Sequence, residues 1–404
     1  MRFFLFLLPL FLLVSCGDAD TAGDGTDEMG LPEIPKLLAR PVALQGNVEW
    51  DAVQSNYMKV ASALRTTNKQ GVEPRIQLAQ VFINEARVTG EHGHYYPAAL
   101  KVLNEALELN RGKDPNLEFE ALSTKASVEL SQHDFASALV TAKKAVALNP
   151  YNAQVYGALV DANVELGNYD EAVKLADKMV EIRPDLRSYS RVSYLREIHG
   201  DVDGAIAAMD LAVKAGAPGY ESTAWARQTM GELYRRYGMP EKAEAMFRAA
   251  LNDRANYPFA IAGLAELEMD KGNYAQAEKL LDSAAAIIPE VGFYVTKAEL
   301  YHKQERKEEM KATVAEIMPM LKDDVDSGHN MDLEYATVYR DLDQDYDKAL
   351  KYAMTEYDKR PENIDVNRMV ATILVAQGKK EDAAPYLERA ARTKSKHPEL
   401  VAMQ

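Results

Sequence analysis

Apolar residues recur along most of this chain at the three- and four-residue spacing of amphipathic helices, most clearly over residues 257–291. That stretch predicts two short helices. Gly272 lies between them and can end the first helix in the left-handed conformation, while Asn273 with Gln276 can cap the second. Pro289 then stops the second helix. Such a pair cannot bury its apolar surface alone, so it needs neighbours of the same kind.

Small and aromatic residues also stand at fixed places in this unit. Counted from its start, alanine is eighth, glycine fifteenth, tyrosine seventeenth, alanine twentieth and twenty-seventh, and proline thirty-second. Alanine or glycine at a crossing point lets two helices approach closely, and larger side chains fill the space beside them. The pattern recurs in units that begin near Phe119, Ala153, Leu186, Ala224, Pro258, Val291, Asn330 and Ile364.

This pattern is similar to the tetratricopeptide repeat (TPR), a helix-turn-helix unit of about 34 residues. The two best-matching units carry Tyr156, Leu159, Gly167, Tyr169, Ala172 and Pro184, and Ala265, Gly272, Tyr274, Ala277, Ala284 and Pro289. The resemblance covers roughly residues 72–397, with a degenerate first unit. It implies an all-α, right-handed superhelical solenoid of about eight to nine helix-turn-helix units.

The start of the chain predicts export to a bacterial cell envelope. After Arg2, the apolar run over residues 3–14 is too short to cross a membrane and is placed as a secretory signal. Residues 13–16 resemble a lipobox, in which Cys16 becomes the first residue and carries lipid such as palmitate. We therefore expect a lipid tether, not a membrane span. Because Cys16 is the only cysteine, no disulfide can stabilise the fold.

The residues after Cys16 bear on which membrane holds the protein. Gly17 does not resemble the aspartate of the enterobacterial inner-membrane signal, so an outer-membrane lipoprotein is expected, facing the periplasm or the cell surface. The acidic stretch that follows resembles the surface-export signals of some Bacteroidetes lipoproteins, and it reads equally well as a solvated linker. The expected organisation is a signal peptide (1–15), a lipidated cysteine with a disordered acidic, proline-containing tether (16–46), irregular N-terminal helices with a degenerate repeat (47–118), the TPR array (119–397) and a polar tail (398–404).

Charge and motifs exclude several classes of function. The net charge of −15 disfavours a nucleic-acid partner, because neutralising phosphates requires a basic surface. The chain has no phosphate-binding loop, no GxSxG elbow, no HExxH motif and no spare cysteine. We therefore expect neither an enzyme nor a cofactor.

Two clusters resemble metal sites only in part. Glu91, His92 and His94 could approach a transition metal, but a structural zinc ion needs a fourth ligand and none is near in sequence. Four aspartates alternate as in a calcium loop, with tyrosines where an EF-hand needs glycine and glutamate. These are Asp341, Asp343, Asp345 and Asp347. We expect no metal at either cluster, and we expect the aspartates to cap a helix.

In TPR domains the first helices line a concave groove, and ligand contacts come from the second, fifth, ninth, twelfth and thirteenth places of each unit. Those places hold Gln154, Asp161, Arg187, Ser190, Tyr194, Trp225, Gln228, Glu232, Arg235, Arg236, Phe259 and Glu266, and Arg191 can reach the same face. An accessible tryptophan with clustered arginines is typical of binding hot spots. The alternative is that Trp225 packs under the junction before it and that the arginines pair with local carboxylates. Ser190 and Tyr194 stand where the carboxylate clamp of chaperone-binding TPR domains needs lysine and asparagine, so capture of a free peptide C-terminus is not supported.

These observations predict a non-enzymatic scaffold that binds envelope proteins through its concave groove. The partner-binding residues expected are Arg187, Arg191, Tyr194, Trp225, Gln228, Glu232, Arg235, Arg236 and Phe259. The alternative is capture of a glycan or small solute at the outer membrane. That role would need Tyr194, Trp225 and Phe259 on one exposed face.

Overall fold

The computed structural model describes residues 33–66 and 70–403, and these residues form α-helices and one short 3-10 helix, with no strand. Cys16 and the expected signal peptide lie outside them. The helices are η1 (Val42–Leu44), α1 (Asn47–Thr66), α2 (Val72–Thr89), α3 (His92–Asn110), α4 (Pro115–Ser131), α5 (Phe135–Leu148), α6 (Ala153–Glu165), α7 (Tyr169–Ile182), α8 (Leu186–Ile198), α9 (Val202–Ala215), α10 (Glu221–Arg236), α11 (Pro240–Asp253), α12 (Pro258–Asp270), α13 (Tyr274–Ile287), α14 (Val291–Lys303), α15 (Lys307–Asp326), α16 (Asp332–Asp341), α17 (Tyr346–Lys359), α18 (Ile364–Ala376), α19 (Lys380–Ala391) and α20 (Pro398–Met403).

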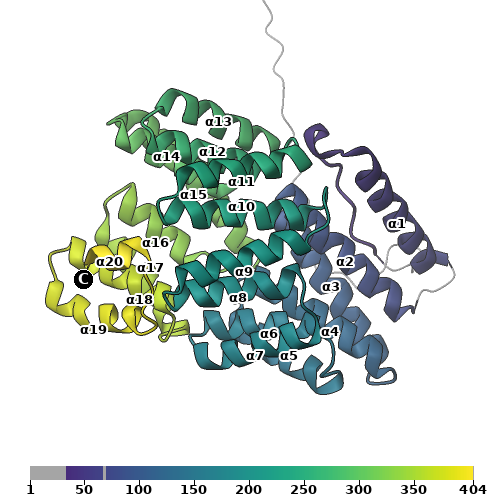
Figure 1. Ribbon diagram of the computed structural model, residues 1–404. Coiled ribbons are helices and arrows are strands. Elements are labelled where there is room, and N and C mark those ends of the chain that lie inside the picture. Colours follow the sequence, from purple (N-terminus) through teal and green to yellow (C-terminus); the bar gives the residue numbers. More distant parts are fainter. Residues whose placement is uncertain (1–32, 67–69, 404) are drawn as a thin grey trace, which may run out of the picture.

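The helices from α2 to α19 form antiparallel pairs, and successive pairs stack into the predicted superhelical solenoid (Figure 1). The first helix of each pair contacts the first helix of the next along most of the array, so α2, α4, α6, α8, α10, α12 and α14 form one continuous inner layer. The second helices cover it from outside. Predicted unit starts coincide with the first residues of α6, α8, α12, α14 and α18.

The small residues of the repeat lie at helix crossings, as their packing role requires. Ala265, Ala277 and Ala284 are fully buried. Gly272 has φ +78°, which confirms the left-handed end of α12. The capping box expected for α13 is wrong: Asn273 makes no cap hydrogen bond, and its Nδ2 donates to Glu268 Oε2 at 2.8 Å.

The superhelix is wound so tightly that its later units contact its earlier ones. Hydrogen bonds join Gln132 to Ser327, His133 to Asn330 and Asn363 to Glu165, pairs that lie 195 to 198 positions apart. That separation corresponds to about six units of 34 residues. We call this line of contacts the seam; it joins the loops at 89–93, 131–134, 165–169 and 199–201 to those at 288–290, 327–330, 360–364 and 392–396. In Figure 1 the C-terminal helices accordingly lie beside α8 and α9.

The segment 33–46, expected to be part of a disordered tether, is packed against the first helices. Arg40 is 3% exposed, and its Nε and Nη2 donate to the two carboxylate oxygens of Glu85 in α2 at 2.7 and 2.6 Å. Ile34 and Leu44 are buried on either side of it. The expectation was wrong for these residues because a long-range ion pair fixes a segment whose local composition gives no sign of order.

The predicted polar tail also differs, because α20 occupies most of it. Leu400 is 1% exposed, and Glu399 pairs with Arg340 of α16 at 3.0 Å and with Arg368 of α18 at 3.1 Å. The last residues therefore cover the inner face of the final units. Among the described residues, no helix combines the length and apolar character that crossing a membrane requires.

Candidate binding cavity

The first helices of the earlier units enclose a cavity of about 720 Å³, lined by side chains of α2, α4, α6, α8, α10 and α12. The array is closed at the seam, and α20 covers the inner face of the final units. The cavity is the part of the inner face that remains open to a ligand. Five of the predicted groove residues line it: Arg187, Arg191, Trp225, Gln228 and Phe259. Gln154 and Ser190, at groove places of the same repeats, line it as well. Tyr194, Glu232, Arg235 and Arg236 do not.

Three of the predicted arginines are already paired with carboxylates. Arg235 pairs with Glu232, Glu266 and Asp270, and Arg236 pairs with Glu197. These guanidiniums tie neighbouring helices together, as the alternative interpretation required.

The third paired arginine, Arg191, lies on the cavity wall. Its Nε and Nη2 donate to the two carboxylate oxygens of Asp161 at 2.8 and 2.5 Å. Gly157 makes room for this arrangement, because a Cβ there would lie 3.0 Å from Cζ of Arg191. Arg191 is therefore part of the cavity wall and does not present a free charge in the cavity.

Arg187 of α8 and Arg87 of α2 are different. Both are exposed in the cavity, and neither guanidinium has an ion-pair or hydrogen-bond partner in the described part of the chain. The pKa of Arg187 is lowered by partial burial and by the positive charges of Arg87 and Arg191. Arg87 was missed in the sequence because α2 belongs to the degenerate first unit, where no groove register could be assigned.

Trp225 is 39% exposed on the cavity wall, so it does not pack under the preceding junction. Phe259 lies on the same wall, and its ring centroid is 5.5 Å from that of Tyr257. Tyr194 lies elsewhere, with its hydroxyl 3.4 Å from Asp365 Oδ2. The three aromatics therefore do not form the single platform that the glycan alternative needed.

Carboxamides and one carboxylate complete the polar part of the wall. Gln80, Asn84 and Gln154 line the cavity, and within the described residues their side chains have no hydrogen-bond partner. The acidic residue of the lining is Glu221, whose pKa is raised by burial against the opposing effect of Arg87. Tyr257 donates its hydroxyl to this carboxylate at 3.3 Å. The cavity is thus basic in a protein whose net charge is −15.

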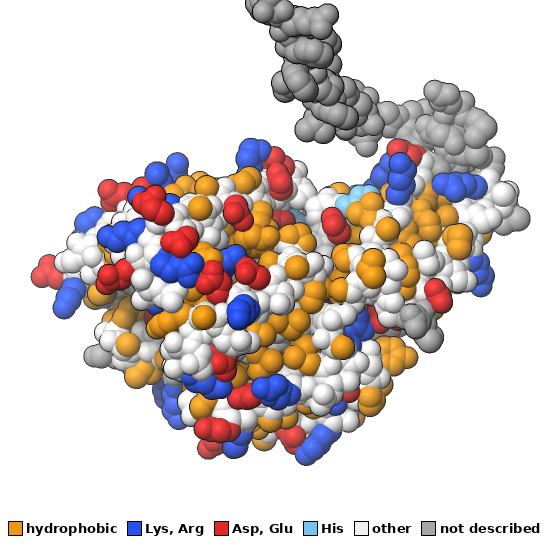
Figure 2. Space-filling model, turned by 90° about the horizontal axis from the view of Figure 1, so that it is seen from above, with side chains coloured by type: hydrophobic (Ala, Val, Ile, Leu, Met, Phe, Trp, Pro, Cys, Tyr) orange, Lys and Arg blue, Asp and Glu red, His pale blue; other side chains and the backbone are white. Residues whose placement is uncertain are grey.

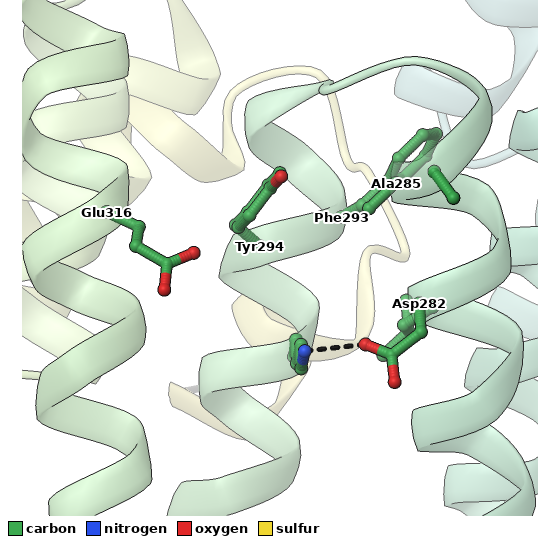
Figure 3. A pocket seen from close by; sticks show the side chains of 8 residues that line it. Asp282, Ala285, Phe293, Tyr294 and Glu316 are labelled. Atoms are coloured by element: carbon green, nitrogen blue, oxygen red, sulfur yellow. Dashed lines mark hydrogen bonds and ion pairs between the residues drawn. The ribbon is translucent and has the colours of Figure 1, made fainter. Parts of the chain in front are cut away.

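The face of the molecule drawn in Figure 2 shows no such concentration of one charge. Figure 2 shows acidic and basic side chains intermixed on one face, with hydrophobic side chains gathered toward its middle. A smaller pocket of about 290 Å³ lies between α13, α14 and α15 (Figure 3). Its lysine, Lys297, donates to Asp282 at 2.6 Å, so that pocket presents no free cation.

The two metal-like clusters do not converge. His92 stacks on Tyr96, while His94 Nε2 lies 2.8 Å from the carbonyl oxygen of Lys36. Asp345 caps α17 by accepting a hydrogen bond from the backbone N–H of Lys348 at 3.1 Å, as expected. Over residues 33–66 and 70–403, no three histidine, cysteine, aspartate or glutamate side chains are grouped so that they could hold a metal ion.

A sequence model described as "Tetratricopeptide repeat" matches residues 129–197 and 234–291. These residues therefore form tetratricopeptide repeats. The match covers all of α5, α6, α7, α11, α12 and α13 and most of α8, and it includes Arg187 and Phe259. A comparison with curated proteins found no match.

The chain is also similar to solved structures. A monomeric mutant of IFIT1 with Gppp-AAAA is 14% identical over 85% of this chain and 75% of that chain, with a TM-score of 0.52. TTC0263, a TPR protein of Thermus thermophilus, is 21% identical over 49% of this chain and 100% of its own, with a TM-score of 0.43. A TPR protein of Parabacteroides merdae is 18% identical over 71% and 97%, with a TM-score of 0.37. At 14% identity the likeness to the IFIT1 mutant concerns the fold alone.

Proposed function

We propose that this TPR protein is a lipid-anchored adaptor of the bacterial cell envelope that holds a segment of a partner protein in its inner cavity. The TPR fold supports a protein-interaction scaffold, and such proteins are generally not catalysts. The observation that carries the proposal is the set of uncommitted groups that line the cavity. Arg87, Arg187 and Trp225 are accessible there, whereas the neighbouring arginines are engaged with carboxylates.

The size of the cavity supports a segment as the ligand. A volume of about 720 Å³ falls in the range of roughly 300–1,000 Å³ that is typical of ligand sites. It is large enough for several residues of extended chain and too small for a folded domain. The partner would therefore insert a loop, a terminus or an unstructured region.

The envelope address rests on the sequence. The apolar run and the lipobox-like residues before Gly17 support a lipid anchor at Cys16, and Gly17 itself supports the outer membrane. Cys16→Ser should abolish incorporation of labelled palmitate and move the protein out of the membrane fraction. If the Ser variant stays in that fraction, the anchor proposal fails.

Partner binding is tested by crosslinking in cells, followed by affinity isolation and mass spectrometry. The variant is Trp225→Ala with Arg187→Ala, which removes one aromatic and one unpaired cation from the cavity. The matched control is Tyr151→Ala with Arg248→Ala, because these residues are an aromatic and a cation on the outer surface. Envelope proteins recovered with the native and control chains but lost from the cavity variant support the proposal. Recovery that does not differ among the three contradicts it.

A further inference from the structure

We infer that the cavity recognises an acidic peptide segment: Arg87 and Arg187 bind a side-chain carboxylate, and Trp225 covers an apolar residue beside it. This inference rests on the proposed function, and it names the chemistry that the partner must carry. It depends on three features of the cavity wall.

The first feature is the pair of unpaired guanidiniums. Arg87 and Arg187 come from α2 and α8, three helix pairs apart along the chain, and the curvature of the superhelix brings them to one cavity. The other lining arginine, Arg191, is neutralised by Asp161. Two like charges facing one space repel each other, and a carboxylate between them would replace that repulsion with charge-assisted hydrogen bonds. The planar guanidinium suits this role because it can bind both oxygens of a carboxylate.

The second feature is the limited amount of positive charge. Three arginines line the cavity, one of them is paired, and Glu221 adds an opposing carboxylate. A nucleic acid carries a phosphate at every nucleotide and would need a basic surface much longer than this one. The surrounding chain, with its net charge of −15, would repel such a polyanion. One or two carboxylates match the available charge.

The third feature is what lies around the arginines. The carboxamides of Gln80, Asn84 and Gln154 have no partners within the described residues, and each offers both a donor and an acceptor. A peptide backbone presents the same alternation of donors and acceptors. Trp225 and Phe259 add apolar surface to the lining of the same cavity. A small organic acid would use the arginines and leave the carboxamides and the tryptophan unused.

The test uses the full lipidated chain in detergent micelles and a random dodecapeptide library displayed on phage. Enriched sequences are synthesised, and their affinities are measured by fluorescence anisotropy. We expect enriched peptides to carry aspartate or glutamate next to an aromatic or aliphatic residue. Replacing that acid by its amide should weaken binding roughly 10- to 100-fold, the loss of one charge-assisted bidentate contact.

Two substitutions with opposite effects separate recognition from misfolding. Arg187→Gln removes one of the two free guanidiniums and should weaken binding of the acidic peptide roughly 10-fold or more. Glu221→Gln removes the opposing carboxylate and should strengthen it several-fold. A fold defect would weaken binding in both variants. Thermal melting of Arg187→Gln should match that of the native chain, because this guanidinium has no partner in the described structure.

The outcomes distinguish the inference from the proposed function. Peptides that bind in a Trp225-dependent manner without acidic residues, and unchanged by Arg187→Gln, overturn the inference and leave the adaptor role standing. No Trp225-dependent peptide at all overturns both. Citrate and oligoadenylate serve as further probes. If either binds through Arg187 while acidic peptides do not, the ligand is a small carboxylate or a phosphate chain and the inference is overturned.

Discussion

Closure of the superhelix can be tested at a single glycine. Gly167, at the α6–α7 turn, has φ +80°, and a Cβ added to it would lie 2.3 Å from the backbone oxygen of Glu362 across the seam. Gly272 has the same place in its own repeat and φ +78°, but nothing lies within 4 Å of its added Cβ. The two glycines therefore differ in the seam contact, and Gly272→Ala is the matched control for Gly167→Ala.

The stability that each alanine variant should lose follows from two energetic costs. A left-handed alanine costs about 1–2 kcal/mol at either site. At Gly167 the two turns must also separate by about 1 Å to reach an ordinary contact of 3.4 Å. That movement strains the hydrogen bonds from Arg392 Nη2 to Gly167 O, 2.6 Å, and from Asn363 Nδ2 to Glu165 O, 2.9 Å. Overpacking of this kind typically costs about 1–3 kcal/mol.

We therefore expect Gly167→Ala to lose about 1–3 kcal/mol more free energy of unfolding than Gly272→Ala. Urea titration followed by far-ultraviolet circular dichroism measures both, and small-angle X-ray scattering reports the radius of gyration. An increase in that radius for Gly167→Ala alone would show that the seam opens. Equal losses for the two variants, with unchanged scattering, would refute the seam as a stabilising contact.

Three further predictions concern other parts of the fold. Arg40→Ala should lower the free energy of unfolding by about 3–5 kcal/mol, because it leaves the fully buried Glu85 without its partner. Limited proteolysis should then cut within residues 33–46, and resistance to cleavage there would contradict this. Asp345→Ala should lower the free energy of unfolding by about 1 kcal/mol, because it removes the cap of α17. Calcium should not change the melting temperature of the native chain. A rise in that temperature with calcium would restore the calcium-loop interpretation. His92 has its pKa lowered to about 4 by burial and by neighbouring histidines, so its contribution to stability is complete above pH 6.5 and declines as the pH falls toward 4. Between pH 7 and 5 the native chain should lose about 2 kcal/mol of free energy of unfolding relative to His92→Gln. Glu290, whose pKa is raised to about 7, has the opposite effect on stability, but it is present in both chains and cancels in the comparison. Parallel profiles of stability against pH for the two chains would count against this assignment.

The repeats could be predicted because their signals are local. The spacing of Ala265, Gly272, Ala277 and Ala284 reports one helix crossing and one left-handed turn, and both are decided within a single unit. The same locality placed Trp225 and Arg187 on the inner face. It also allowed the aspartates before α17 to be read as a cap.

The features that could not be predicted all depend on contacts far apart in sequence. The ion pair between Arg40 and Glu85 joins residues 45 positions apart, and neither residue stands out in its own surroundings. The seam joins residues about 200 positions apart and arises from small rotations that add up over six units. The same accumulated rotations bring Arg87 to the cavity that Arg187 lines. A sequence that gives the geometry of one unit well does not give the sum of these rotations.

Closure also limits how the cavity can bind. In an open solenoid a partner can lie along the groove as a whole helix, and the superhelix can flex to accept it. Here the turns that follow α2 and α8 both contact later units at the seam, which restricts movement of Arg87 relative to Arg187. A partner that enters as an extended segment must lose its own conformational freedom on binding, which lowers affinity for a given contact area. The preformed arrangement of arginines and carboxamides offsets part of that cost, because those side chains are already gathered on rigid helices before the ligand arrives.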